Sequence, residues 1–211
     1  DYTLCLAWQT PCGTYYIFEK QKPMVEERDL RWKTISSKPL FNENWLNIRV
    51  DTCEKPDGSI VSPYYVYDFP NWVCAFAITA GGEVILERQY RHALQHTGIE
   101  LPGGCVDTTD KSLEDAIARE LLEETGYVFD HFESLGITSS NPSTNSNLMY
   151  MFLATGGKKV QDPTPDPGED IEIKLVSIDE VIHLLRNNSF IQSMHITTVF
   201  RALEKLGKLT Y

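Results

Sequence analysis

The sequence lacks long apolar runs, and positively charged side chains are in the minority. No stretch approaches the roughly 20 apolar residues of a membrane-spanning helix, and the first ten residues lack the pattern of a secretory signal. Lysine and arginine number 19 against 30 acidic residues, for a net charge of −11. Such a chain repels phosphate backbones and anionic lipids, so we expect neither nucleic acid nor membrane as a partner. A small anionic substrate stays compatible, because a bound cation can neutralise it locally.

The sequence has few cysteines, and their spacing shows no paired motif. The five are odd in number, scattered, and form no CxxC pair; they are Cys5, Cys12, Cys53, Cys74 and Cys105. This usage argues against a disulfide framework and favours a reducing compartment. We therefore expect a cytoplasmic protein.

What the sequence does contain is a mixture of strand and helix patterns after a less regular beginning. With 211 residues and 42% hydrophobic content, the chain can bury one sizeable core and carry a small appendage. Residues 1 to about 40 show no sustained period. Further along, alternating apolar residues between turn residues predict strands at 45–50, 64–69, 72–79, 83–90, 132–138, 148–154 and 171–176. Helical patterns predict helices at 113–125, 178–186 and about 195–206, so we expect an α/β protein rich in hairpins.

Turn and capping signals support this assignment. Gly81-Gly82 suits the positive φ of a tight hairpin turn. Ser112 and Asp115 have the spacing of a capping box, and Gly126 is placed to end the same helix. The loop predicted at 156–170, GGKKVQDPTPDPGED, is long for a compact domain, and long loops are often functional lids.

The helix predicted at 113–125 carries carboxylates where apolar residues are expected. At about 100° per residue, Glu120 and Glu124 lie only about 40° apart and extend the face that begins with Leu113, Ala116 and Ile117. Burying two like charges costs roughly several kcal/mol for each charge, unless the two carboxylates share a cation. A hard divalent ion with oxygen ligands removes that cost, and magnesium suits a site that also holds phosphates.

The ordinary explanation of such a charge run is an acidic helix end that faces solvent. Two neighbouring features favour a metal site instead. Arg119 precedes Glu123 by four residues, so the two can pair and hold the carboxylate cluster in place. The turn Leu101-Pro102-Gly103-Gly104 lets the backbone approach a ligand closely or offer a carbonyl to a metal.

The segment Arg119 to Tyr127, RELLEETGY, resembles the second half of the Nudix box at every fixed position. The first half departs from the family pattern, in which a glycine is followed after five residues by glutamate and after seven more by the arginine. If Gly104 is that glycine, this chain has one extra residue. Asp110 is then the candidate for the role of the first glutamate, from a displaced position.

Further markers resemble the ADP-ribose pyrophosphatase subgroup of that family. Arg88-Gln89-Tyr90-Arg91 is followed by Glu100-Leu101-Pro102-Gly103-Gly104, and Pro142 follows Tyr127 by fifteen residues. The loop that ends Gly168-Glu169-Asp170-Ile171 is similar to the family loop whose glutamate binds metal or activates water. No carboxylate lies at 143–147, where the family's alternative base is found, so the resemblance favours Glu169.

The resemblance implies a fold, a reaction and a set of site residues. The fold is an α/β/α sandwich with a mixed central sheet over residues 69–211, preceded by a β-rich, dimer-forming extension over 1–68. The reaction is magnesium-dependent hydrolysis of a nucleoside diphosphate sugar, most simply ADP-ribose to AMP and ribose 5-phosphate, with manganese as a substitute ion and a homodimer as the assembly. The implied metal-binding residues are Glu120, Glu124, Glu123 and Gly103. The implied catalytic residues are Glu169, Glu123 and Arg119. The implied substrate-binding residues are Arg88, Arg91, Glu100 and Gly104.

Two alternative functions stay open. The irregular first half of the box is compatible with a noncatalytic module that senses a nucleotide sugar. A hydrolase of dinucleotide cofactors or capped RNA is the third option, which gains nothing from the acidic composition. The residue that stacks on the base is also open, with four aromatic candidates: Trp45, Tyr64, Tyr65 and Phe69.

Overall fold

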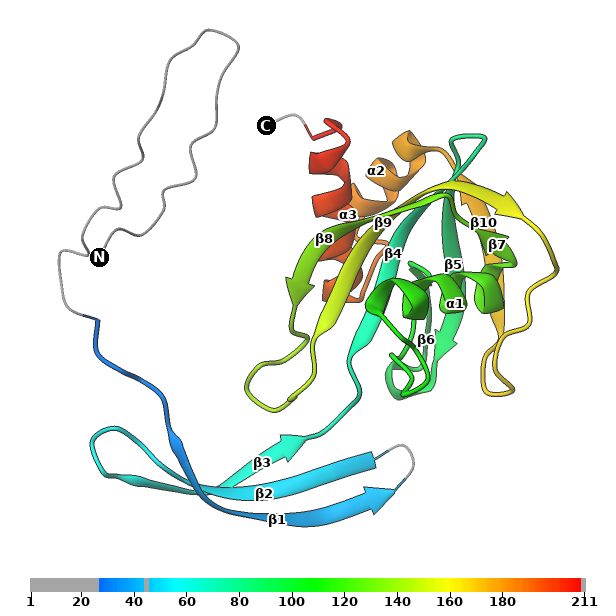
Figure 1. Ribbon diagram of the computed structural model, residues 1–211. Helices are drawn as coiled ribbons and strands as arrows, with labels where there is room; N and C mark the ends of the chain where they lie inside the picture. Colours follow the sequence, from blue (N-terminus) through cyan, green and yellow to red (C-terminus); the bar gives the residue numbers. More distant parts are fainter. Residues whose placement is uncertain (1–26, 44–45, 210–211) are drawn as a thin grey trace, which may run out of the picture.

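A computed structural model describes residues 27–43 and 46–209 of the chain, as two β-sheets and three α-helices (Figure 1). The small sheet contains β1 (Lys33–Glu43), β2 (Leu46–Glu54) and β3 (Ile60–Tyr67). The large sheet contains β4 (Trp72–Thr79), β5 (Val84–Arg91), β6 (His96–Glu100), β7 (Tyr127–Val128), β8 (His131–Thr138), β9 (Met149–Lys159) and β10 (Ile171–Val176). The helices are α1 (Leu113–Thr125), α2 (Ile178–Arg186) and α3 (Ser193–Lys205), with a short 3-10 turn at His92–Leu94.

The large sheet is mixed, as the sequence predicts. Its strands run in the order β10-β5-β4-β9-β7, with β6 on β5 and β8 on β9. β4 and β9 are parallel, with Trp72 opposite Met149, whereas the other pairs are antiparallel. The parallel pair lies at the centre of the sheet and is buried on both faces.

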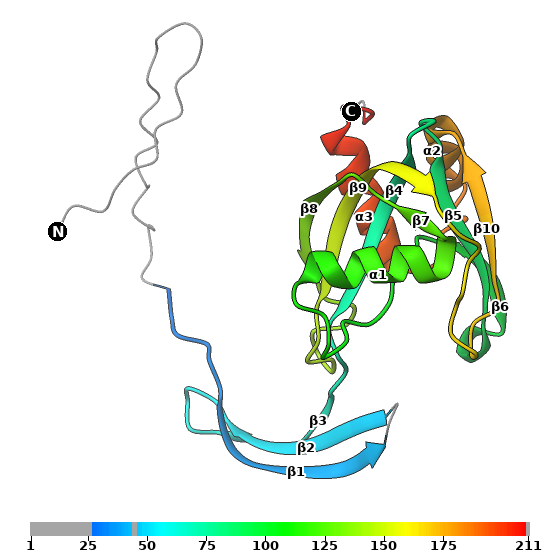
Figure 2. The same cartoon turned by 45° about the vertical axis from the view of Figure 1, so that its right-hand side comes forward.

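The core consists of two layers, one on each face of this sheet. Along β4, Val73, Ala75 and Ala77 point to the face that α1 covers. The alternate residues Cys74 and Phe76 point to the face covered by α2 and α3. Figure 2 shows α1 crossing in front of the sheet and α3 behind it. The expected α/β/α sandwich is therefore confirmed.

Helix α1 begins and ends where its sequence signals place it. The Ser112 hydroxyl accepts a hydrogen bond from the Asp115 N–H at 3.0 Å, which satisfies one of the free donors of the first turn. Gly126 has φ +77° and donates its N–H to the Leu122 carbonyl. These caps fix the helix, and with it the position of its glutamates.

Several strand assignments differ from the sequence prediction. β1, β6 and β7 were not predicted: β1 is exposed along its whole length and so lacks an alternating pattern, and β6 and β7 are only five and two residues long. β2 ends at Glu54 rather than near residue 50, and β3 spans Ile60–Tyr67 rather than 64–69. β9 continues to Lys159, so Gly156 and Gly157 lie in a strand rather than in the loop predicted at 156–170. A β-carbon on Gly157 would come within 2.6 Å of the Phe129 ring, so packing rather than loop flexibility explains that glycine.

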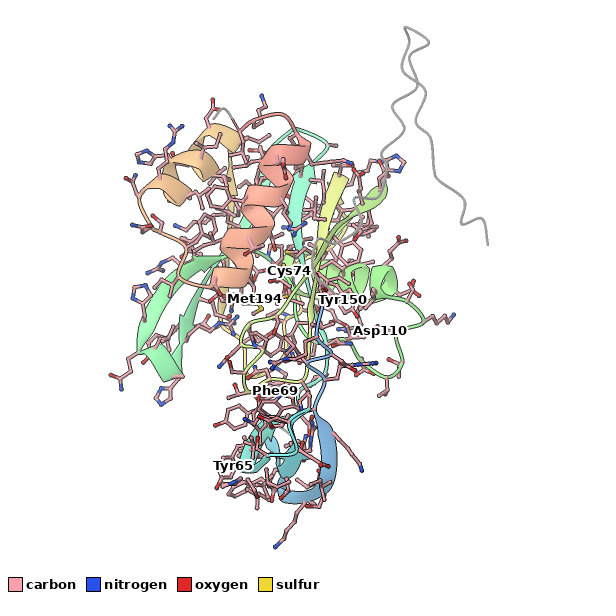
Figure 3. All side chains as sticks on the ribbon, turned by 90° about the vertical axis from the view of Figure 1, so that its left-hand side faces the viewer. Tyr65, Phe69, Cys74, Asp110, Tyr150 and Met194 are labelled. Carbon is pink, nitrogen blue, oxygen red and sulfur yellow. The ribbon has the colours of Figure 1, made fainter. Side chains whose placement is uncertain are left out.

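The small sheet joins the rest of the molecule through β3 and the loop before β9. Tyr67 pairs with Asn145, and the Tyr64 hydroxyl donates to the Ser143 carbonyl at 2.7 Å. Figure 3 shows Phe69 at this junction and Tyr65 farther out in the small sheet. The division at residues 68 and 69 falls between β3 and β4 and stays a prediction.

The structure also describes three of the cysteines and the length of the helices. Cys53, Cys74 and Cys105 carry free thiols, whereas Cys5 and Cys12 lie outside the described residues. Within 27–43 and 46–209, no helix has the length and apolar character needed to cross a membrane.

Candidate active site

The turn between β6 and α1 provides a backbone carbonyl at the base of the site. The carbonyls of Pro102 and Gly104 accept hydrogen bonds from the β4 backbone at 3.0 and 2.9 Å. The Gly103 carbonyl, between them, accepts none of the hydrogen bonds found in the described part of the chain. Gly103 has φ +150°, and a β-carbon there would lie 2.2 Å from the Val73 carbonyl oxygen. Only glycine fits this turn, which leaves one carbonyl available to a ligand.

Glu124, in the last turn of α1, forms a hydrogen bond with the backbone of the turn that contains Gly103. Its Oε2 accepts the Gly103 N–H at 2.8 Å, and the residue is only 4% exposed. Burial, followed by the charges of Glu87 and Glu120, raises the pKa of Glu124 far above that of an ordinary carboxyl. The carboxyl therefore carries a proton at neutral pH unless a cation compensates its charge.

Glu120 lies one helical turn earlier, against the same backbone. Its side chain is 12% exposed, and burial raises its pKa to about 7, with the Arg119 charge acting in the opposite direction. A β-carbon on Gly104 would come within 2.6 Å of Glu120 Oε1. The absence of a side chain at Gly104 is therefore what allows the carboxylate to rest on the turn.

This contact makes Gly104→Ala a sensitive test of the site. We expect the added methyl group to displace the Glu120 carboxylate and to lower turnover about tenfold to hundredfold, since small misplacements of a reacting group carry penalties of that size. Stability should change little, because the obstructing atoms are the end of a flexible side chain. The matched control is Gly81→Ala, whose β-carbon would meet its nearest neighbours at 3.5 and 3.7 Å. Equal activity of the two variants, measured by steady-state kinetics, would contradict the placement.

Arg119 forms hydrogen bonds with three of the acidic side chains and so holds them close together. Its Nε and Nη2 donate to the two carboxylate oxygens of Asp110, each at 3.0 Å. Its Nη1 donates to Glu120 and Glu123 at 3.0 Å, and Nη2 also donates to the Cys105 carbonyl at 2.9 Å. Glu123 is 43% exposed on its side chain, so it forms the rim rather than the floor of the site.

Asp110, the candidate for the displaced first glutamate of the box, belongs to these contacts. The Asp110 side chain is only 5% exposed, and the Arg119 guanidinium lowers the pKa of Asp110 below its usual value. Asp107 folds the extra residue into a turn by accepting the Thr109 N–H at 2.8 Å, while its own N–H donates to Asp110. In this structure Asp110 holds the arginine, despite its shifted position in the sequence.

The sheet supplies the other side of the site. Arg91 makes a two-pronged contact with Glu100, with Nε to Oε1 at 3.0 Å and Nη2 to Oε2 at 2.7 Å. Behind this pair, His195 of α3 accepts the Leu101 N–H on its Nδ1 at 3.2 Å. Burial lowers the pKa of His195 to about 4, so the ring is neutral and able to accept. His195 thus fixes the strand end that leads into the glycine turn, a contact that the sequence alone does not indicate.

Glu87 is the buried carboxylate that sequence reasoning missed. It lies on β5 directly opposite Glu100 and is only 3% exposed. Its carboxyl lies within hydrogen-bonding reach of Glu124, and burial raises its pKa to about 8. The available signal was the period of two, which places Glu87 on the same sheet face as the buried Ile85.

Arg88 is the one predicted site residue that the structure places apart. Its side chain alternates to the face opposite Glu87 and pairs with Glu172 of β10 at 3.0 Å. Both side chains are about half exposed. Its substrate-binding role stays a prediction that these contacts do not support, whereas Arg91 lies beside the buried glutamates.

Glu169 reaches the cluster from the loop before β10. The loop is attached to α1, since Thr164 donates its N–H to the Glu123 carbonyl at 2.7 Å. After burial, which is the largest cause, the charge of Glu169 makes a smaller contribution that also raises the pKa of Glu87, Glu120 and Glu124. One Glu169 oxygen accepts the Asp166 N–H at 3.1 Å.

The acidic groups fit a divalent cation in chemistry. Three of them are 6% exposed or less, namely Glu87, Glu100 and Glu124. Arg91 is the cation paired within this group, and Arg119 is shared among carboxylates of the box. Across residues 27–43 and 46–209, no three acidic, histidine or cysteine side chains are already drawn together as a metal cage. Small side-chain rotations would therefore accompany binding.

Among the aromatic candidates, Phe69 packs against other aromatic rings. Its ring centroid is 5.8 Å from that of Trp72 and 6.3 Å from that of Tyr67. Tyr65 is 51% exposed in the small sheet, away from this stack. Trp45 lies outside the described residues.

Comparison with known proteins identifies both parts of the chain. A model of the NUDIX domain matches residues 69–195, and a model of the nucleoside diphosphate sugar hydrolase N-terminal domain matches residues 32–67. The methanol dehydrogenase activator of Bacillus methanolicus is 26% identical over 168 residues, covering 79% of this chain and 90% of the relative. The ADP-ribose pyrophosphatase of Bacillus subtilis is 26% identical over 161 residues, covering 76% and 86%.

The fold also has a close structural counterpart. A crystal structure of an ADP compounds hydrolase superposes with a TM-score of 0.74 at 19% identity, covering 87% of this chain and all of the other. The NUDIX model spans more than half of the sequence. The protein therefore belongs to the Nudix hydrolase family, in the branch that carries the N-terminal domain of nucleoside diphosphate sugar hydrolases.

Proposed function

We propose that this Nudix hydrolase, which acts on phosphorus-containing anhydrides, is a magnesium-dependent pyrophosphatase that converts ADP-ribose to AMP and ribose 5-phosphate. The observation that carries the proposal is the group of buried carboxylates against the Gly103-Gly104 turn. Burying these groups without a compensating cation is costly, and a magnesium site beside a diphosphate removes that cost. The name of the Bacillus subtilis relative supports ADP-ribose as the substrate. The free thiols at Cys53, Cys74 and Cys105 support the cytoplasm as its location.

The residues that would hold the metal are Glu120, Glu124 and the Gly103 carbonyl, with Glu123 at the rim. Manganese, a similar hard divalent ion, would substitute. When bound, such an ion offsets the diphosphate charge and lowers the pKa of the attacking water. Arg119 keeps Glu120 and Glu123 in position through its Nη1 contacts at 3.0 Å.

The remaining steps belong to side chains of the sheet and the loop. Glu169 accepts the proton of the water that attacks one phosphorus, from a loop long enough to close over the substrate. Arg91 keeps one guanidinium nitrogen free of Glu100 contacts, which suits a phosphate or ribose oxygen. Glu100 and Gly104 fix the orientation of that arginine and of the glycine turn.

The direct test is a product analysis with purified protein and a panel of substrates. With magnesium, we expect AMP and ribose 5-phosphate from ADP-ribose, and loss of turnover on addition of a chelator that manganese reverses. The panel should include other nucleoside diphosphate sugars, dinucleotide cofactors and capped RNA. Faster cleavage of either of the last two classes would replace the proposed substrate, and no cleavage of any compound would remove the activity.

A second candidate is a noncatalytic module that senses a nucleotide sugar. It is favoured by the irregular first half of the box and by the relative named as an activator of methanol dehydrogenase. The same panel separates the two, because a sensor binds ADP-ribose in calorimetry with magnesium or manganese but releases no product. The intact set of box glutamates, Glu120, Glu123 and Glu124, favours catalysis.

The small sheet supports a homodimer as the working assembly. β1 is an 11-residue edge strand that is exposed along its length, and it pairs only with β2 in the described chain. The exposed apolar side chains of this region include Trp32, Ile35, Leu40, Phe41 and Ile60. A long apolar edge of this kind favours pairing with another chain, and a second copy is the simplest partner.

Replacing one of these side chains tests the dimer. We expect the wild-type protein to have twice the mass of one chain in light scattering, and Phe41→Asp to shift it to the monomer. The control is Ile137→Asp on β8, because Ile137 is 51% exposed and Phe41 is 54% exposed. A wild-type monomer, or equal dissociation of both variants, would contradict the assignment of the interface.

A further inference from the structure

Glu87 extends the acidic site into the central sheet. It belongs to β5, whereas the family box contributes its glutamates from α1. On a strand buried on both faces, the residues before it are Val84, Ile85 and Leu86. A carboxylate that follows three buried apolar residues and is itself 3% exposed calls for a physical explanation.

The carboxyl of Glu87 lies within hydrogen-bonding reach of Glu124, but this contact occupies only part of its hydrogen-bonding capacity. Its Oε1 is buried and has no hydrogen-bond partner among the described residues. Arg91, the nearby cation, uses its Nε and Nη2 on the two oxygens of Glu100. A buried oxygen without a partner costs about 1–3 kcal/mol, so an ordinary packing position would favour an apolar side chain.

The carboxyl groups around Glu87 all belong to the proposed active site. Glu124 of α1 lies within hydrogen-bonding reach, Glu100 of β6 faces it across the strand pair, and the charge of Glu169 also acts on it. Glu87 therefore lies where the sheet, the helix and the loop converge. An oxygen with no protein partner at this point is suited to a hard cation, which prefers oxygen ligands.

We propose that Glu87 is a further carboxylate ligand for a divalent cation, which it binds together with Glu124 from the sheet side of the site. This inference rests on the proposed metal-dependent function and deepens it, since it adds a ligand from β5 to those of α1 and the glycine turn. Its consequence is tighter cation binding before substrate arrives.

The test measures manganese binding without turnover. Free Mn²⁺ is titrated by electron paramagnetic resonance against the full-length wild type and against Glu87→Gln and Glu87→Val. We expect both variants to weaken Mn²⁺ binding by at least about tenfold, the scale of effects seen when groups around a metal are removed. The valine variant guards against loss of the fold, because it suits a buried strand.

Two controls separate ligation from other effects. Glu83→Gln, in the exposed turn of the same hairpin, should bind Mn²⁺ like the wild type. Glu100→Gln removes the same charge from a buried carboxylate whose oxygens are already occupied by Arg91. If Glu100→Gln and Glu87→Gln weakened Mn²⁺ binding equally, the effect would be one of long-range charge and the proposal would be overturned. Unchanged Mn²⁺ affinity in both Glu87 variants would also overturn it. A wild type that binds no Mn²⁺ would instead remove the metal-dependent function on which this inference rests.

Discussion

Glu124→Gln should abolish hydrolysis and, in the absence of metal, make the protein more stable. The amide keeps the shape of the side chain and can still accept the Gly103 N–H, which Glu124 now accepts at 2.8 Å. It cannot supply a negative oxygen to a cation. We expect turnover of ADP-ribose to fall by about three orders of magnitude or more, because a metal ligand and a charge near the reacting groups are lost together.

The stability change follows from the direction of the pKa shift. Burial and the neighbouring carboxylates raise the pKa of Glu124 in the folded protein. Below the unfolded value, near 4.5, both states hold the proton and no penalty exists. Above it the unfolded chain releases the proton while the folded chain keeps it, so stability falls by about 1.4 kcal/mol per pH unit. By pH 7, which lies 2.5 units above the unfolded value, the penalty reaches about 3.5 kcal/mol at most, and glutamine removes it.

Denaturation at pH 5, 6, 7 and 8, either with a chelator or with added magnesium, measures this effect. Wild type should lose stability as the pH rises and regain it with magnesium, whereas the variant should show a weaker response to both. Glu114→Gln, at an exposed position in the first turn of α1, is the control and should match the wild type. A metal-free Glu124→Gln protein less stable than wild type at pH 8 would show that the carboxylate is not under the electrostatic strain described here.

Glu169→Gln should reduce kcat about 10²-fold to 10⁴-fold while leaving the fold intact, the range expected when a general base is removed. Glu169 lies on the loop before β10, and its charge is felt by Glu120 and Glu124. Residues 143–147, where the family's alternative base is found, contain no carboxylate. Binding of ADP-ribose should change much less than kcat.

Asp162→Asn is the matched control in the same loop, because the Asp162 side chain is 94% exposed. Single-turnover kinetics would separate chemistry from loop movement in both variants. If Glu169→Gln kept more than about a fifth of wild-type kcat, another group would have to take the proton, and the assignment of the base would be wrong.

The sequence predicts the elements whose local signals agree with their environment. Helix α1 has its cap at Ser112 and its glycine at 126, and its predicted bounds match the structure. β10 and α2 were also predicted with the observed bounds. β1 was missed because an edge strand exposed on all sides carries no hydrophobic period, so its pairing with β2 comes from the backbone rather than from burial.

The residues of the site also fall into those that the sequence predicts and those that it does not. Box residues are predictable because one helix places Glu120 and Glu124 on a single face, which periodicity reveals. Contacts between distant elements are not predictable in this way. The pairing of Glu87 with Glu100 and the hydrogen bond from Leu101 to His195 are therefore seen only in the folded structure. Arg88 and Arg91 look equivalent in sequence, yet they alternate to opposite faces of β5.

We propose that Glu120 and Glu124 jointly bind a divalent cation at the Gly103-Gly104 turn. Crystals soaked with Mn²⁺ test it most directly through anomalous scattering. We expect an anomalous peak bound by both carboxylates and the Gly103 carbonyl, at the roughly 2.0–2.2 Å typical of a small hard cation. Crystals with saturating Mn²⁺ but no peak there, and with both glutamate side chains still resting against the turn, would contradict it.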